Sequence, residues 1–442
     1  MVSEAVPEPV PEPMIELWFD FSCPYAYLAS QKAPGLARAA QIELAWKPML
    51  LGGVFRGIGA GDGPMPSLGA AKAVHNVRDM ERWAEIFGVP FRMPAAHPMR
   101  TIRALRVLLG LPNASWPAAI AAIYAAYWQR AEDVTSDEVL ANALRPVVAK
   151  GELEAAFATA DSDAIKDELR RRTDEAIALG IFGAPAWILR DPSGARLIWG
   201  QDRLPWVEAA LAGWSFTGPP PGGPRPFGTD LTPFHSLHHI DIYFDVSSPF
   251  AYFALTQVGA LARATGATPA MHPILLGGLF RDIGQVDVPL LAMNASKLRY
   301  TRAELDRWAA WWGEPFAMPT KFPQRTITAQ RLCVLAAERG FAACLALALA
   351  LGRAMWAEQR DLEDPDTLRA ILDGVGLPRA WVERTAEPEV KAALIRETTA
   401  AKDAGCFGVP SFVVTNSSGA HMVWGQDRLD LVQRFLAGWD VP

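Results

Sequence analysis

The stretch Phe19-Asp-Phe-Ser-Cys-Pro-Tyr-Ala-Tyr27 determines how the rest of the chain is interpreted, because it occurs twice. It returns as Phe244-Asp-Val-Ser-Ser-Pro-Phe-Ala-Tyr252, 225 positions further along, from 19 to 244. In each copy a short apolar run leads into a turn that ends in proline, a residue favoured at the first position of a helix. The pattern therefore predicts a buried strand followed by a helix at two places in the chain.

Three further motifs repeat with the same offset, which indicates a duplicated domain of about 200 residues rather than a solenoid. The paired segments are Pro48–Arg56 with Pro273–Arg281, Phe182-Gly-Ala-Pro185 with Phe407-Gly-Val-Pro410, and Trp199-Gly-Gln-Asp-Arg-Leu204 with Trp424-Gly-Gln-Asp-Arg-Leu429.

The repeat sets the expected domain boundaries. We expect a first domain over 14–214 and a second over 238–440. Residues 1–13, which are acidic and rich in proline, predict a disordered tail, and the Pro/Gly-rich segment 215–237 predicts a linker.

Each copy shows the order strand, helix, strand, long helical segment, hairpin, helix. In the first copy the expected strands are 15–21, 42–47, 185–189 and 196–199, the helical segment is about 72–179, and the last helix is 202–214. This order predicts an α/β fold with a large all-helical insertion in each domain.

Composition excludes several classes of protein. Half of the 442 residues are hydrophobic and 20% are charged, which suffices for packed cores and excludes general disorder. The net charge of −6 and the absence of a long basic run argue against nucleic-acid binding. The tail lacks the features of a signal peptide, and the apolar stretch 333–355 contains charges and favours a buried helix over a membrane span. We expect a cytoplasmic protein.

Four cysteines are too few and too irregularly spaced for a disulfide framework or a cysteine-rich metal site. His75 and His97 have no second ligand at metal-binding spacing, so no metal is expected.

The first candidate for chemistry is the residue that opens the first helix, Cys23 in one copy and Ser248 in the other. A group at this position faces free backbone N–H groups and the positive end of the helix dipole, which stabilise a thiolate. We therefore expect a lowered pKa for Cys23, and its alkylation before that of the other cysteines. The simpler alternative is an ordinary helix cap.

The second candidate is the proline of the Phe-Gly-x-Pro motif, Ala184-Pro185 and Val409-Pro410. A cis proline here would expose the backbone of the preceding residue for pairing with a peptide-like ligand. The alternative is a proline that merely begins a strand.

Polar pairs and two lysines complete the candidates. Gln201-Asp202 and Gln426-Asp427 precede the last helix, where aspartate could hold an ammonium group or act as a helix cap. Lys72 and Lys297 open the helical insertions, and the alternative for each is a solvated surface lysine.

Taken together, the four ordered motifs resemble the 2-hydroxychromene-2-carboxylate isomerase family. That family is similar to kappa-class glutathione transferases, in the DsbA-like branch of the thioredoxin fold. The resemblance covers nearly the whole chain twice and implies two tandem thioredoxin-like domains. It implies glutathione as cofactor and a small aromatic substrate, isomerised by thiolate addition, rotation and elimination.

The resemblance also implies residue roles. Ser248, and Cys23 in the first copy, would support the glutathione thiolate. The backbone next to Pro410 or Pro185, at Val409 or Ala184, would pair with the cysteinyl unit. The γ-glutamyl end would meet the Gln-Asp pairs, and the lysines would take part in the same sites; the full set is Gln426, Asp427, Gln201, Asp202, Lys297 and Lys72.

The first copy departs from the family pattern, because Cys23 stands where these isomerases have serine and Ala26 where a dithiol oxidase has its second cysteine. A dithiol oxidase needs both sulfurs. Thiol–disulfide chemistry or glutathione transfer at Cys23 therefore remains the alternative function, beside a binding protein without turnover. Because family members are usually homodimers, we expect the two copies to form an internal pseudo-dimer.

Overall fold

The computed structural model describes residues 14–61, 63, 68–191, 194–223, 238–286 and 288–441. The expected tail at 1–13 and residues 224–237 of the expected linker lie outside this description. Contacts between residues divide the chain into two compact units. Unit 1 comprises Met1–Ser67, Val77–Trp214 and Asn294–Tyr300, and unit 2 comprises Leu68–Asn76, Ser215–Met293 and Thr301–Pro442.

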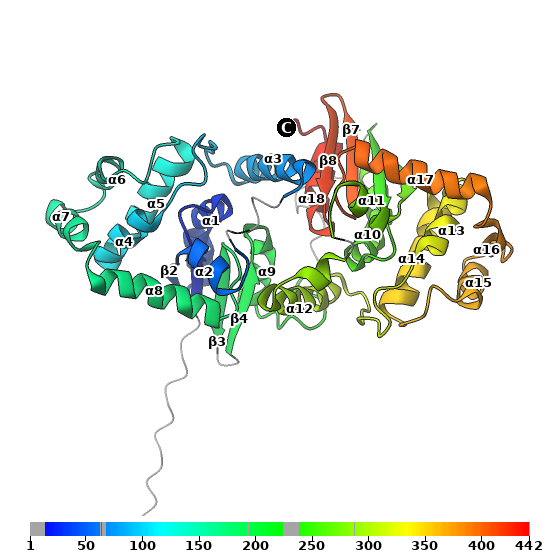
Figure 1. Ribbon diagram of the computed structural model, residues 1–442, viewed down its shortest axis with the longest axis horizontal. Coiled ribbons are helices and arrows are strands. Elements are labelled where there is room, and N and C mark those ends of the chain that lie inside the picture. The colour runs from blue at the N-terminus through cyan, green and yellow to red at the C-terminus, as the bar shows by residue number, and fades with distance from the viewer. Residues whose placement is uncertain are drawn as a thin grey trace, which may run out of the picture. The chain divides into compact units, whose positions relative to one another are not determined.

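The two copies have nearly the same order of elements (Figure 1). The first copy contains β1 (Met14–Phe19), α1 (Pro24–Ala40), β2 (Glu43–Pro48), α2 (Leu51–Gly57), α3 (Ala70–Phe87), α4 (Ile102–Gly110), α5 (Trp116–Tyr124), a π-helical segment (Ala125–Gln129), α6 (Asp137–Leu144), α7 (Lys150–Thr159), α8 (Asp163–Ala178), β3 (Ala186–Asp191), β4 (Gly194–Trp199) and α9 (Leu204–Leu211).

The second copy contains β5 (His239–Phe244), α10 (Pro249–Thr265), β6 (Thr268–Pro273), α11 (Leu276–Asp282), α12 (Ala295–Trp312), α13 (Ile327–Ala337), α14 (Phe341–Trp356), α15 (Pro365–Gly374), α16 (Trp381–Arg384), α17 (Pro388–Asp403), β7 (Ser411–Asn416), β8 (Gly419–Trp424) and α18 (Leu429–Leu436).

Each copy builds one mixed four-stranded sheet, in the orders β2-β1-β3-β4 and β6-β5-β7-β8. The first two strands of each copy are parallel and are connected through α1 or α10, as a parallel pair requires. The last two strands form an antiparallel hairpin that pairs with the central strand. The inner strands, β1 and β3 in the first copy and β5 and β7 in the second, have a neighbouring strand on both sides.

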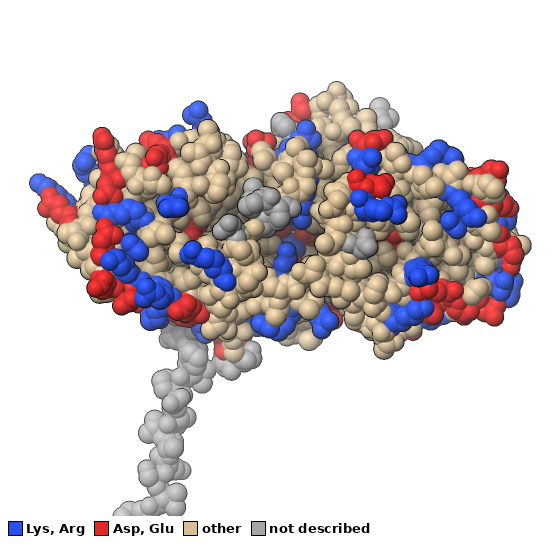
Figure 2. Space-filling view, in the orientation of Figure 1, with Lys and Arg blue, Asp and Glu red and all other residues tan. Residues whose placement is uncertain are grey.

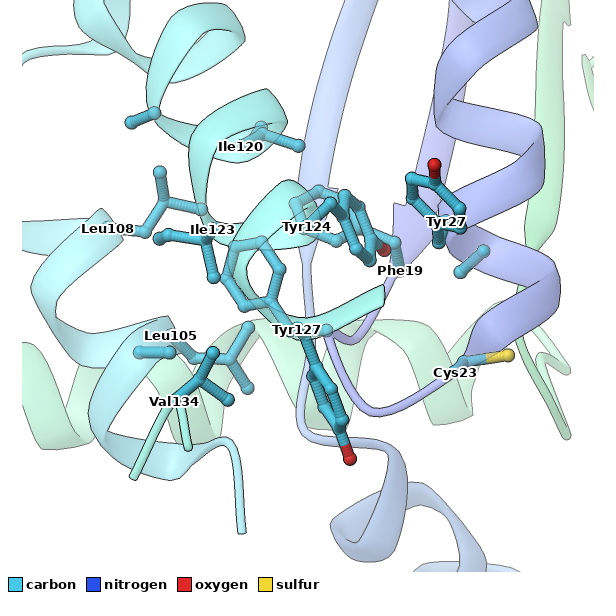
Figure 3. Close-up of a cluster of buried hydrophobic side chains, with 14 of the residues drawn as sticks. Phe19, Cys23, Tyr27, Leu105, Leu108, Ile120, Ile123, Tyr124, Tyr127 and Val134 are labelled. Atoms are coloured by element: carbon cyan, nitrogen blue, oxygen red, sulfur yellow. The ribbon is translucent and has the colours of Figure 1, made fainter. Parts of the chain in front are cut away.

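The helical insertions lie to one side of the strands within each copy. Figure 1 shows α4 to α7 beside the strands of the first copy, and α13 to α16 beside those of the second. In unit 1 an aromatic group joins the insertion to the sheet, with the ring of Tyr124 lying 5.0 Å from Phe21 and 6.0 Å from Phe19. Figure 3 shows Cys23 at the start of α1, next to this buried cluster. The predicted α/β class with helical insertions is confirmed.

Two expected helices differ in extent. The last helix of the first copy begins at Leu204 rather than at 202, because Gln201–Arg203 forms a 3₁₀ turn. The apolar stretch 333–355 is divided between α13 and α14 at Gly340, which has a φ of 104°. Within the described ranges, none of the helices combines the length and apolar character needed to span a bilayer. On the face shown in Figure 2, basic and acidic side chains of the described residues are interspersed.

Candidate functional site

The hydroxyl of Ser248 lies at the N-terminus of α10 in unit 2. Its Oγ accepts a hydrogen bond from the backbone N–H of Ala251 at 3.2 Å and donates one to the carbonyl oxygen of Val409 at 3.3 Å. Ser248 is therefore both the helix cap and a contact to the residue before Pro410. The residue is buried, at 6% exposure. The structure thus brings together two of the residues that the sequence placed in one site.

A buried aspartate holds this turn in place. The carboxylate of Asp245 accepts hydrogen bonds from Ser247 N at 2.9 Å, Leu276 N at 2.8 Å and Thr326 Oγ1 at 2.9 Å. Burial raises the pKa of Asp245, and these hydrogen bonds act in the opposite direction. Asp20 makes the corresponding bonds in unit 1. Neither aspartate was predicted as a functional residue, although both occur at the same position of the repeated first motif.

In unit 1 the position that corresponds to Ser248 is occupied by Cys23, whose thiol has different hydrogen-bonding and ionisation properties. The Cys23 thiol donates a hydrogen bond to the carbonyl oxygen of Ala184 at 3.1 Å. Burial raises the pKa of Cys23 to about 12, and the Asp20 charge adds to this effect. The expected lowering of the Cys23 pKa is therefore wrong. The lowering of the pKa that the start of a helix would cause is outweighed, because burial removes the Cys23 thiol from water and disfavours the thiolate.

The proline after each of these carbonyl groups is cis, as the sequence analysis considered for Pro185 and Pro410. In unit 2 the indole of Trp424 packs on the glycine before Val409: a Cβ added to Gly408 would lie 2.8 Å from Trp424 Nε1. That buried Nε1 finds no acceptor among the described residues. A buried indole N–H usually has a partner, so this donor is suited to a ligand oxygen.

Gln426 supplies a second buried donor of the same kind. Its Oε1 accepts from Trp312 Nε1 at 2.7 Å, whereas its Nε2 has no acceptor within the described part of the chain. Asp427 pairs with Arg428 at 3.0 Å. Unit 1 repeats the arrangement: Gln201 Nε2 and Trp199 Nε1 also lack described acceptors, and Asp202 pairs with Arg203 at 3.1 Å.

Each of the two lysines belongs to the unit that is formed mainly by the other copy of the repeat. Lys72 belongs to unit 2, where its Nζ lies 5.3 Å from the ring centroid of Trp424 and 5.9 Å from that of Phe407. Lys297 belongs to unit 1, where its backbone N–H bonds to Asn294 Oδ1 at 3.0 Å. This placement was not predictable from the sequence, because residue spacing does not indicate which copy a segment packs against.

The chain is similar in sequence to several known proteins. The chain is 25% identical over 209 residues to glutathione S-transferase kappa 1 of Caenorhabditis elegans, which covers 45% of this chain and 91% of that protein. It is 28% identical over 198 residues to 2-hydroxychromene-2-carboxylate isomerase of Sphingobium xenophagum, covering 45% of this chain and 97% of that protein. A solved structure of such an isomerase is 26% identical, with a TM-score of 0.40, and covers 45% of this chain and 95% of its own.

The family model named DSBA-like thioredoxin domain matches residues 14–212 and again residues 239–437. These two matches account for most of the chain and coincide with the two copies of the sheet. The chain therefore belongs to the DSBA-like thioredoxin domain family and carries that domain twice.

Proposed function

We propose that unit 2 binds glutathione beside Ser248 and catalyses a glutathione-dependent isomerisation of a small aromatic compound, of the 2-hydroxychromene-2-carboxylate isomerase type. The observation that carries the proposal is the position of Ser248 Oγ, which receives the Ala251 N–H and has its own proton directed at Val409 O. Turning that O–H toward a sulfur would stabilise an anion at the start of α10.

The donors of unit 2 fit the proposed cofactor. Trp424 Nε1 and Gln426 Nε2 are buried donors that have no acceptor among the described residues, and glutathione offers carboxylate and carbonyl oxygens. The backbone of Val409 would pair with its cysteinyl unit, and Asp427 would meet its α-amino group. When bound, glutathione would supply a thiolate that adds to a conjugated double bond and leaves again after rotation, so that no net electrons are consumed.

The residues of the chain would hold and orient the reactants rather than exchange electrons with them. Ser248 would keep its proton and donate a hydrogen bond to the thiolate. Asp245 would fix the turn that presents Ser248, through its bond to Ser247 N. Positioning of sulfur and substrate in one pocket would supply the remaining acceleration.

Cys23 is the basis of the competing proposal, thiol–disulfide exchange or glutathione transfer in unit 1. With its pKa raised to about 12, the Cys23 thiol would stay protonated at pH 7. This environment favours Ser248 as the reactive position. The packing of the two copies into an internal pseudo-dimer and a cytoplasmic location stay predictions.

Ser248→Ala tests the proposal, with Cys23→Ala as the matched change in unit 1. We expect Ser248→Ala to lower glutathione-dependent isomerisation by about 10²-fold, the effect of losing one preorganised donor to an anion. It should also remove the ultraviolet absorbance of bound glutathione thiolate, whereas Cys23→Ala should preserve both signals. Unchanged turnover and absorbance in Ser248→Ala would reject the assignment to Ser248. Reduction of small disulfides that is lost only in Cys23→Ala would support the competing proposal.

A further inference from the structure

We infer that Gln330, on α13 of the helical insertion, is a positioning residue that orients Ser248 by holding the turn between β5 and α10. This role rests on the proposed function and adds to it a residue that acts on the glutathione sulfur only through Ser248. It also identifies a second difference between the two copies, beside the exchange of serine for Cys23.

The side-chain amide of Gln330 is fully buried and makes three hydrogen bonds to the backbone of unit 2. Its Nε2 donates to the carbonyl oxygens of Phe244 at 2.9 Å and Ile274 at 2.8 Å. Its Oε1 accepts from the backbone N–H of Val246 at 3.3 Å. The exposure of the residue is 0%. Because an unpaired buried donor or acceptor costs free energy, the three bonds fix the orientation of the amide.

These three backbone groups belong to the two segments that leave the parallel strands of the sheet. Phe244 ends β5, and Val246 lies two residues before Ser248. Ile274 directly follows β6, and its own N–H bonds to the carbonyl oxygen of Phe244 at 3.0 Å. Gln330 therefore links the turn that leads into Ser248 to the loop that follows β6, at the edge where both strands end.

The helical insertion holds this turn at more than one point. Thr326, four residues before Gln330 and so about one helical turn away, bonds to the carboxylate of Asp245. The indole Nε1 of Trp356 donates to the carbonyl oxygen of Val246 at 2.8 Å. Both peptide groups of Val246 are thus fixed by side chains of the insertion, its N–H by Gln330 and its carbonyl by Trp356.

The first copy has a leucine where the second has Gln330. Leu105 lies four residues after Thr101, as Gln330 lies after Thr326, and both threonines bond to the aspartate of the turn. Leu105 is also fully buried and belongs to the hydrophobic cluster of Figure 3. An apolar residue therefore suffices for packing at this position. A buried amide is costly unless its hydrogen bonds are made, so its presence in the copy with the serine points to orientation of the turn.

Gln330→Met tests this role in the full chain, because it keeps an unbranched side chain of similar length and removes all three hydrogen bonds. We expect it to lower the acid dissociation constant of the bound glutathione thiol by about tenfold, since a displaced Ser248 donates a weaker hydrogen bond to the thiolate. Titration of the thiolate absorbance against pH measures this. Gln330→Glu keeps an acceptor for the N–H of Val246 and should lower the constant by only about threefold.

Thr265→Val is the matched control for a general loss of stability in unit 2. Thr265 is fully buried at the other end of α10, and its hydroxyl donates to the carbonyl oxygen of Leu261 at 2.9 Å. The substitution should lower the free energy of unfolding in urea, as Gln330→Met should, and leave the acid dissociation constant of the bound thiol unchanged.

A double variant separates positioning from an independent effect. In calorimetric titration of glutathione at pH 7, Gln330→Met should weaken binding by about fivefold in the native chain. In the Ser248→Ala chain the same substitution should change the affinity by less than about twofold, because the hydroxyl that Gln330 positions is gone.

The outcomes distinguish this role from the proposed function. Equal weakening in both backgrounds would overturn the action of Gln330 through Ser248, and so would an equal change of the acid dissociation constant in Thr265→Val. If urea unfolding shows that Gln330→Met does not fold, the same comparisons with Gln330→Glu decide. Absence of any thiolate absorbance in the native protein would reject the proposed function itself, and this role with it.

Discussion

The stability of unit 2 should fall between pH 7 and pH 9 because of His272 on β6. Its two ring nitrogens contact carboxylates: Nε2 lies 2.9 Å from Asp241 Oδ1 and Nδ1 lies 2.7 Å from Glu397 Oε2. Burial acts to lower the pKa of His272, but the two carboxylates outweigh it and raise the pKa from 6.5 to about 9. The ring of Tyr243 stacks on the imidazole, and His239 shares Asp241 at 2.8 Å.

The sign and size follow from linkage. Because the folded pKa lies above the unfolded value, the folded chain binds the proton more tightly. The stabilisation is fully present below pH 6.5 and is lost as the pH rises through about 9. At about 1.36 kcal/mol for each pKa unit, the contribution is at most about 3 kcal/mol, of which about 2 kcal/mol should disappear between pH 7 and pH 9.

Urea unfolding at pH 7 and pH 9 measures this loss, and the first copy suggests the matched control. The repeat counterpart of His272 is Lys47, which lies 3.6 Å from the Glu16 carboxylate. His272→Lys should keep the positive charge at both pH values, so its stability should change little over this interval. His272→Gln should be less stable at pH 7 and equally insensitive to pH. A native chain whose free energy of unfolding is the same at pH 7 and pH 9 would refute the reasoning.

Two further predictions concern Gly408 and the cysteines. Gly408→Ala should lower the free energy of unfolding by about 1–3 kcal/mol, because its Cβ would lie 2.8 Å from Trp424 Nε1. It should also weaken glutathione binding. Gly277→Ala in α11, whose Cβ would meet nothing within 4 Å, is the control for urea unfolding. Brief alkylation at neutral pH, followed by mass mapping, should modify Cys23 before the other three cysteines, because Cys23 is 7% exposed. The reaction should be slow, because the pKa of Cys23 is raised to about 12. Preferential labelling of Cys406, at 1% exposure, would contradict this prediction.

The fold was predictable because each helix or strand pattern occurs twice in the sequence, so that one copy supports the interpretation of the other. The strand that precedes Pro24 and the strand that precedes Pro249 have the same apolar pattern, and both are central strands of their sheets. The hairpin after Pro185 was also visible, since two apolar runs flank a turn. Local pattern and helix-start chemistry therefore sufficed for the elements and for the position of Ser248.

The properties that depend on packing were not predictable. The Cys23 pKa is raised by burial in a cluster that also contains Tyr124, which comes from the helical insertion a hundred residues away in the chain. The unsatisfied N–H of Trp424 depends in the same way on its contact with Gly408. Such features arise where distant segments meet, and a motif specifies only its own local geometry.

The departure of the first copy from the family pattern at Cys23 does not by itself make that copy dispensable. Replacement of serine by Cys23 removes the stronger hydrogen-bond donor from that copy, and burial keeps the thiol protonated. Loss of chemistry at Cys23 would nevertheless not make the first repeat dispensable. The same repeat carries Lys72, whose Nζ lies 5.3 Å from the ring centroid of Trp424, and His75, whose ring lies 5.2 Å from Phe407. A variant that combines Cys23→Ala with Lys72→Gln should therefore lose no more glutathione binding than Lys72→Gln alone, because the buried thiol stays protonated; titration of glutathione against the single and double variants measures this.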